Sequence, residues 1–118
     1  MKFLFLIYHD EKVLDDMPPK EMQSLVDSAL EYDDEIRRSG HYIASNALQR
    51  ARTARTIRVR GGKVTVTDGP FAETKEQLGG FFLVDARDMD EACALAARFP
   101  PGRIGVIEVR PVQELQHS

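Results

Sequence analysis

The sequence has few of the residues that crosslink small proteins. It contains one cysteine, Cys93, and three histidines among 118 residues. One cysteine forms no disulfide within a chain, and no two of the histidines have the spacing of a zinc site. We therefore expect no metal, no cofactor and a reducing, cytoplasmic location. The fold must rest on a hydrophobic core, for which 42% hydrophobic residues are sufficient.

The sequence also lacks a long hydrophobic run and an excess of positive charge. The apolar run Phe3–Tyr8 is too short to cross a bilayer and does not resemble a signal peptide. The formal net charge of −3 argues against a general nucleic-acid or membrane-surface binder. Basic residues do cluster between Arg50 and Lys63. Without interleaved aromatic residues, they are expected to form the solvated face of a hairpin.

Hydrophobic periodicity predicts the order β-α-β, a hairpin, then β-α-β. The strands are expected at Lys2–Tyr8, His41–Leu48, Gly80–Ala86 and Ile104–Arg110, the hairpin at Thr56–Thr67, and the helices at Pro19–Ser39 and from Asp88 to about Phe99. This order predicts an α+β fold, formed by one domain over residues 1–118. Its ferredoxin-like antiparallel sheet has two helices on one face.

The two helices have apolar stripes that should pack on this sheet. The first stripe contains Met22, Leu25, Val26, Ala29, Leu30 and Ile36. The second contains Met89, Ala92, Cys93, Ala96 and Phe99, in a helix that starts with a capping box and is ended by Pro100-Pro101-Gly102.

The two central strands are apolar on both faces, although helices can cover only one. In the first strand, Phe3, Phe5 and Ile7 alternate with Leu4, Leu6 and Tyr8, and Phe81–Val84 repeats the pattern. An uncovered apolar face is unusual in a soluble monomer. We therefore expect a homodimer that packs sheet to sheet into an α/β barrel. In the alternative, a monomer, residues 68–79 fold over the open face.

Two residues are candidate proton carriers. Asp33 lies within the apolar stripe of the first helix, where a carboxylate must be paired, protonated or turned to a cavity. Arg37, one turn later, could neutralise it; otherwise Asp33 is a candidate general acid or base. Tyr32, at the edge of the same stripe, is a candidate for contact with substrate. His9 follows the first strand and is either an acid–base group or a solvent-exposed loop histidine.

The segment from Val66 to Leu83 combines a rigid corner with paired glycines. Asp68-Gly69-Pro70 is typical of a turn, but the connection that follows is long for a compact domain. We expect it to form the mouth of a pocket. Its candidate site residues are Asp68 as a catalytic group, with Phe71, Glu73, Gly79 and Gly80 in contact with substrate.

The run DGPFAETKE within this segment resembles the DGPF branch of the YCII-related family, and LIYHD, YDDEIRRSGHY and VRGGK agree at the same places. The resemblance covers nearly the whole chain. It implies a dimeric α/β barrel with a small cavity between sheet and helices. A few relatives are dehydrochlorinases with a proposed His–Asp pair, but the first helix here has no histidine, so that role is not transferred. DGPF members are also often encoded beside, or fused to, extracytoplasmic-function sigma factors.

Two functions therefore stay open. One is a cofactor-independent enzyme that isomerises a small organic molecule or eliminates a group from it. The other is a non-enzymatic module that senses a ligand or binds a sigma factor.

Overall fold

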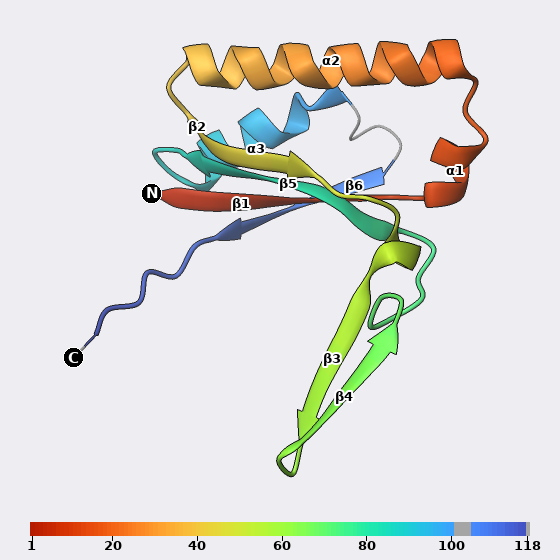
Figure 1. Cartoon of the computed structure of the whole chain (residues 1–118). Coiled ribbons are helices and arrows are strands. Elements are labelled where there is room, and N and C mark those ends of the chain that lie inside the picture. Colours follow the sequence, from red (N-terminus) through yellow and green to blue (C-terminus); the bar gives the residue numbers. More distant parts are fainter. Residues whose placement is uncertain (101–104, 118) are drawn as a thin grey trace.

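The computed structural model describes residues 1–100 and 105–117. Its main sheet has four antiparallel strands in the order β2-β5-β1-β6 (Figure 1). These strands are β1 (Lys2–His9), β2 (Tyr42–Ala47), β5 (Gln77–Asp85) and β6 (Gly105–Pro111). The order confirms the predicted ferredoxin-like arrangement. Strand β5 begins three residues earlier than expected, which brings Gly79 and Gly80 into the sheet.

Two helices, α2 (Pro19–Arg38) and α3 (Met89–Ala97), cover one face of the sheet, as predicted (Figure 1). Pro19 begins α2, and the side chain of Asp88 caps α3 by accepting a hydrogen bond from the Glu91 amide at 2.9 Å. Two short elements escaped the sequence prediction. They are α1 (Glu11–Asp15), capped by Asp10, and the 3-10 turn η1 (Ala51–Thr53).

The core lies between the helices and one face of β1 and β5. Phe3, Phe5 and Val84 are almost completely buried there, as the alternation of β1 and β5 requires. Three aromatic rings close the core at α3. Tyr32, Phe82 and Phe99 contact one another edge to face, with centroids 5.2–5.5 Å apart.

Part of each predicted helix stripe is wrong. In α3 the buried residues are Ala92, Leu95 and Ala96, while Cys93 is exposed. Leu95 takes the core position because α3 turns its Ala92–Ala96 edge to the sheet. In α2 only Tyr32 and Ile36 are buried, and Leu30 is 59% exposed. The first half of α2 therefore does not pack tightly on the sheet.

The predicted hairpin forms a separate two-stranded arm. Strand β3 (Arg55–Arg60) pairs with β4 (Lys63–Asp68), and Gly61 and Gly62 both have the positive φ that this turn needs. The arm projects from the main sheet on the side away from α2 and α3 (Figure 1). It makes the radius of gyration 16.4 Å, larger than the about 13.5 Å of a compact chain of this length.

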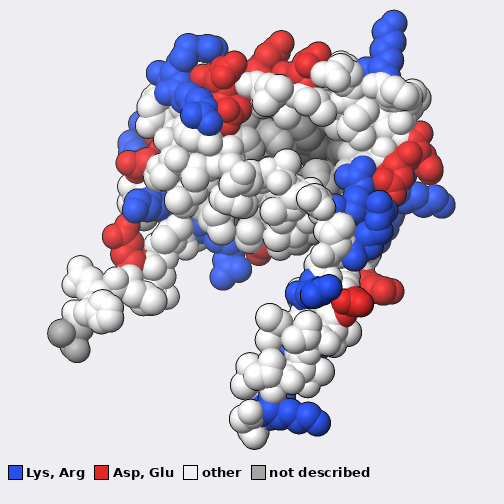
Figure 2. All heavy atoms as spheres, in the orientation of Figure 1, with Lys and Arg blue, Asp and Glu red and all other residues white. Residues whose placement is uncertain are grey.

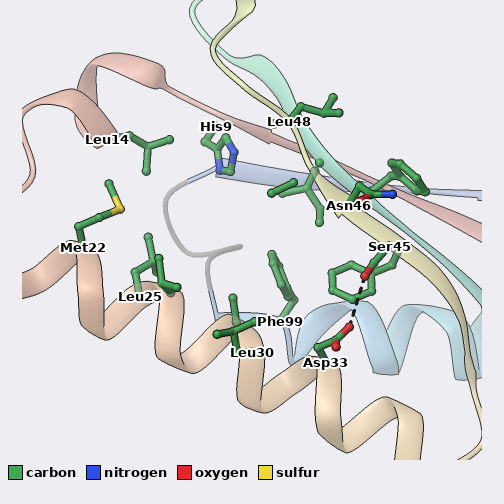
Figure 3. A pocket seen from close by; sticks show the side chains of 18 of the residues that line it. His9, Leu14, Met22, Leu25, Leu30, Asp33, Ser45, Asn46, Leu48 and Phe99 are labelled. Atoms are coloured by element: carbon green, nitrogen blue, oxygen red, sulfur yellow. Dashed lines mark hydrogen bonds between the residues drawn. The ribbon is translucent and has the colours of Figure 1, made fainter.

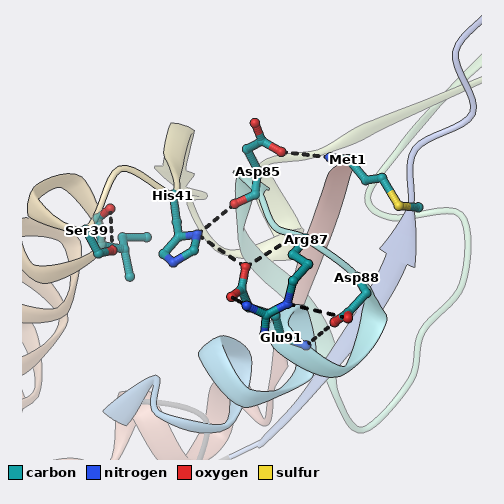
Figure 4. Close-up of polar contacts among 8 residues, drawn as sticks. Met1, Ser39, His41, Asp85, Arg87, Asp88 and Glu91 are labelled. Atoms are coloured by element: carbon teal, nitrogen blue, oxygen red, sulfur yellow. Dashed lines mark hydrogen bonds and ion pairs between the residues drawn. The ribbon is translucent and has the colours of Figure 1, made fainter.

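Polar contacts join the chain ends of β1, β2 and β5 at one end of the sheet (Figure 4). The N-terminal amine of Met1 contacts the Asp85 carboxylate at 2.9 Å and lowers the pKa of this exposed carboxyl group. His41 Nδ1 lies 2.8 Å from the Asp85 carbonyl oxygen. These contacts fix the end of the sheet that lies far from His9.

Parts of two sequence predictions lie outside the described residues: Pro101-Gly102 of the helix stop, and Ile104, the expected first residue of the last strand. Among the helices that the structure describes, none is long and apolar enough to cross a membrane.

Candidate functional site

A cavity of about 500 Å³ lies between the first half of α2 and the sheet (Figures 2 and 3). Its lining is mainly apolar. The helix contributes Met22, Leu25, Val26, Ala29, Leu30 and Asp33; the rest comes from Ile7, His9, Leu14, Ser45, Asn46, Ala47, Leu48, Arg50, Gly79, Gly80, Phe81, Phe82 and Phe99. This volume lies within the range of roughly 300–1,000 Å³ that is typical of small-molecule sites.

Small residues on β2 and β5 leave this volume unfilled. Ser45 pairs with Phe82 and Ala47 pairs with Gly80, on the face of the sheet that lies toward α2. A Cβ atom at Gly80 would lie 3.0 Å from the Asn46 carbonyl oxygen, closer than most side chains tolerate. The sequence therefore keeps this floor free of large side chains, and the apolar residues of α2 line a hollow instead of a filled core.

Asp33 lies at one end of the cavity and is paired. Its carboxylate accepts a hydrogen bond from Arg37 Nε at 2.8 Å and another from the Ser45 hydroxyl at 3.3 Å. The Arg37 guanidinium also stacks over the Tyr42 ring, 3.8 Å from its centroid. The Asp33 side chain is 19% exposed, forms an ion pair with Arg37 and also lines the cavity.

His9 lies at the opposite end of the cavity (Figure 3). Its Nε2 atom lies over the Gly79 backbone, and Nδ1 is buried without a hydrogen-bond partner among the described residues. Burial lowers the pKa of His9, and the Arg50 charge lowers it further, against a smaller opposite effect of Glu11. His9 is therefore neutral at pH 7.

The buried nitrogen also influences the tautomer of His9. A protonated Nδ1 would be a buried donor without an acceptor, which costs more than an unfilled lone pair. The favoured form is thus a neutral imidazole with its proton on Nε2. In this form His9 is a hydrogen-bond donor toward the cavity.

The structure brings four of the predicted site residues to one cavity: His9, Asp33, Gly79 and Gly80. Tyr32, one residue before Asp33, turns the other way. It is 3% exposed and donates its hydroxyl proton to the Leu95 carbonyl oxygen at 2.6 Å, and burial raises its pKa to about 12. Tyr32 belongs to the core and does not line the cavity.

The Asp68 corner lies at the root of the arm, away from this cavity. The Gly69 amide donates to the Ala54 carbonyl oxygen at 2.7 Å, and Asp68 pairs with Arg55 at 3.5 Å, both side chains being exposed. Phe71 is 80% exposed and, with Pro70, borders a second hollow of about 600 Å³. Asp68 and Glu73 line neither hollow, and Glu73 is exposed.

The sequence prediction did not include several cavity residues. The polar ones are Ser45, which donates a hydrogen bond to Asp33, Asn46, and Arg50, which pairs with Asp15 at 2.9 Å. The sequence did contain a signal for Ser45. Small residues occupy alternate positions of the strand Tyr42–Ala47, opposite a helix with large apolar residues. Arg50 had no such signal, because the turn that follows β2 decides its position.

The donor set in the cavity does not resemble a metal centre. Within residues 1–100 and 105–117, no three His, Cys, Asp or Glu side chains come together as metal ligands. His9 and Asp33 lie at opposite ends, with apolar side chains between them (Figure 3).

Comparison with known proteins identifies a domain family and a relative. The sequence model of the YCII-related domain matches residues 1–116. An uncharacterized protein from Rhizobium meliloti (strain 1021) is 33% identical over 114 residues, which are 95% of this chain and 92% of that protein.

Proposed function

The chain belongs to the YCII-related domain family, and from this premise we propose that it is a homodimeric, cofactor-independent enzyme of the DGPF branch. Its reaction is acid–base chemistry, an isomerisation or an elimination, on a small organic molecule. The assignment to the DGPF branch rests on the motif Asp68–Phe71 and the residues around it.

The cavity under α2 is the observation that carries this proposal. Its apolar walls suit the carbon skeleton of a small molecule, and its polar groups lie at two ends. At one end of the cavity, His9 is partly buried, its Nδ1 atom has no hydrogen-bond partner among the described residues, and its pKa is lowered; these are properties of a group that contacts a ligand and not of a surface histidine.

The two polar ends support different roles. The Nε2 proton of His9 can donate a hydrogen bond to a carbonyl oxygen and so stabilise the negative charge that reaches this oxygen through a conjugated chain when a C–H bond at the far end of that chain ionises. The Asp33 carboxylate, which pairs with Arg37, can accept this proton at the other end of the cavity. A substrate that reaches both groups must extend along the cavity, so the site favours an elongated apolar molecule with an oxygen at one end.

The homodimer is proposed from the open face of the sheet. Leu4, Leu6 and Tyr8 lie on the face that no helix covers, and each is only partly buried. Their neighbours on this face include Leu83, Phe81 and Val106, the last being 52% exposed. A second copy placed face to face would bury this surface and form the α/β barrel.

The activity is tested by deuterium exchange at carbon. Elongated α,β-unsaturated ketones are incubated with the protein in D2O, and loss of the NMR signals of their γ-protons is measured. We expect exchange with the wild type, and a loss of about 100-fold or more for His9→Gln and for Asp33→Asn. The melting temperature of each variant serves as the folding control. Exchange that persists in both variants would remove these residues from the mechanism.

A second candidate function is a non-enzymatic ligand sensor, which could act through an extracytoplasmic-function sigma factor. The pairing of Asp33 with Arg37 and Ser45 favours it, because it leaves His9 as the one unpaired candidate in the cavity. Ligand-dependent shifts of cavity resonances without any exchange at carbon, together with capture of a sigma factor, would support this function over the enzyme.

A further inference from the structure

The β3–β4 arm has an apolar face that nothing in its own chain covers. The face consists of two cross-strand pairs, Ile57 with Val66 and Val59 with Val64. These four side chains are 56–64% exposed, although each is a β-branched residue that favours a half-buried sheet. Isolated two-stranded hairpins are only marginally stable in water. Some surface must therefore cover this face.

The direction of the arm limits what that surface is. The arm leaves the end of the main sheet on the side of the open face, opposite to α2 and α3 (Figure 1). Packed sheets are about 10 Å apart, and a six-residue strand extends about 20 Å. A second protein packed on the open face would therefore lie directly beside the arm. The arm would be long enough to extend beyond the sheet of that second protein.

The charges of arm and body are complementary. Residues 55–68 contain four basic side chains and one carboxylate, a formal charge of +3. Because the whole chain has a formal charge of −3, the remaining residues total −6. A basic arm beside the acidic body of a second copy gains long-range attraction, whereas two arms side by side would repel.

We propose that the β3–β4 arm clasps a second copy of this chain, packing the face formed by Ile57, Val59, Val64 and Val66 against the side of the partner's body. The proposal rests on the homodimer proposed above and adds an element to it. In such a dimer each subunit both gives an arm and receives one, so the two clasps are equivalent by symmetry. Arm and sheet face then form one continuous interface.

The test uses two neighbouring positions on β4 that point to opposite faces. Val64→Lys places a charge on the apolar face, and Thr65→Lys places the same charge on the other face, opposite Arg58. The dissociation constant of each dimer is measured by analytical ultracentrifugation over a concentration series. We expect Val64→Lys to raise it about tenfold or more, and Thr65→Lys to change it less than about threefold.

Hydrogen exchange measured by mass spectrometry adds a readout specific to the arm. In the wild type, amides of residues 55–68 should exchange slowly at concentrations where the dimer forms and quickly after dilution to monomer. In Val64→Lys they should exchange quickly at both concentrations, while β1 and β5 stay protected and so report an intact fold.

The outcomes separate the two proposals. If the wild type is a dimer but Val64→Lys dimerises equally well, and the arm amides of the wild-type dimer exchange as quickly as those of the monomer, the clasp is wrong and the sheet-to-sheet dimer stands. If the wild type is a monomer at 100 μM, a concentration at which about micromolar affinity would show, both are wrong. Arm protection that requires another protein instead of a second copy would also overturn the clasp.

Discussion

The pKa of His9 differs between the folded and the unfolded state of the protein. In the unfolded chain its imidazole has the ordinary pKa of 6.5, and in the folded chain burial lowers that pKa. The unfolded state therefore binds more protons than the folded state just below pH 6.5. It follows that protonation of His9 favours unfolding.

We predict a loss of stability on mild acidification that depends on His9. The contribution of His9 is complete above pH 6.5, decreases as the pH falls from 6.5 toward the lowered folded pKa, and is constant below it. Urea unfolding between pH 7.5 and 5 measures this dependence. His9→Gln, which does not titrate, should have a smaller decrease over the same range. An equal decrease in both proteins would contradict the burial of an uncharged His9.

Gly79 is required by the position of His9. A Cβ atom at residue 79 would overlap sterically with Nε2 of the His9 imidazole, so even alanine at this position forces the ring to move. We predict that Gly79→Ala lowers the free energy of unfolding by about 1–3 kcal/mol, as overpacking does. In a His9→Ala background the same change should cost clearly less, because the clash is absent.

The measurement is a double-mutant cycle by urea denaturation. We expect a coupling energy between residues 79 and 9 of about 0.5–3 kcal/mol. Additive effects would show that the ring does not lie over Gly79. The cycle also matters for the site, since a displaced imidazole no longer points Nε2 into the cavity.

At the scale of elements, the sequence predicted most of the fold because its patterns are local. The short apolar runs of β1 and β5, Pro19 at the start of α2 and Asp88 with Glu91 at the start of α3 each depend on residues close in the chain. The five-residue helix α1 was missed, since so short a segment has no measurable periodicity.

The same local patterns could not predict where elements leave space. The apolar stripe of α2 predicts that this helix packs on the sheet. The side chains at positions 45, 47, 79 and 80 of the sheet are, however, too small to fill the space between the sheet and the helix. Likewise, the alternation of the hairpin predicts an apolar face but not that it points away from its own core. Asp33 and His9 were found by their chemistry. Their separation to opposite ends of the cavity depends on the tertiary arrangement (Figure 3).

The two halves of α2 should therefore respond differently to truncation. Ile36 is 1% exposed in the core, whereas Leu30 is 59% exposed at the cavity. We predict that Ile36→Ala costs about 2–5 kcal/mol in the free energy of unfolding and that Leu30→Ala costs about 0.5 kcal/mol or less. Urea denaturation of both variants measures this. Equal costs would mean that the first half of α2 closes onto the sheet in solution and that the cavity is filled.

At the scale of the whole molecule, one face is covered by helices and the other is bare. The arm projects from the body on the bare side, and its apolar residues, like those of the sheet, lack a cover within the described chain (Figure 1). Both apolar surfaces would be stabilised by burial against another protein surface. At about 25 cal/mol per Å², burial of several hundred Å² of apolar surface contributes several kcal/mol. In the proposed dimer, function at the cavity would depend on assembly, because the sheet that forms the cavity floor would also be the interface.

We predict that Leu6→Glu converts the protein to monomers. Leu6 lies in the central strand β1, on the bare face between Phe81 of β5 and Glu108 of β6. A glutamate there would place a carboxylate at the centre of the sheet-to-sheet interface, close to its symmetry mate, where neither charge is solvated. Sedimentation velocity should give a mass near twice 13.3 kDa for the wild type and near 13.3 kDa for the variant.

Ser24→Glu is the matched control, because Ser24 is exposed on α2 and the same charge enters there without leaving water. It should remain dimeric. Far-UV circular dichroism should be unchanged in both variants, since the core lies on the other face of the sheet. If Leu6→Glu stays dimeric with the wild-type dissociation constant, the bare face is not the interface. The copies would then have to meet elsewhere, and the apolar residues of that face would need another explanation.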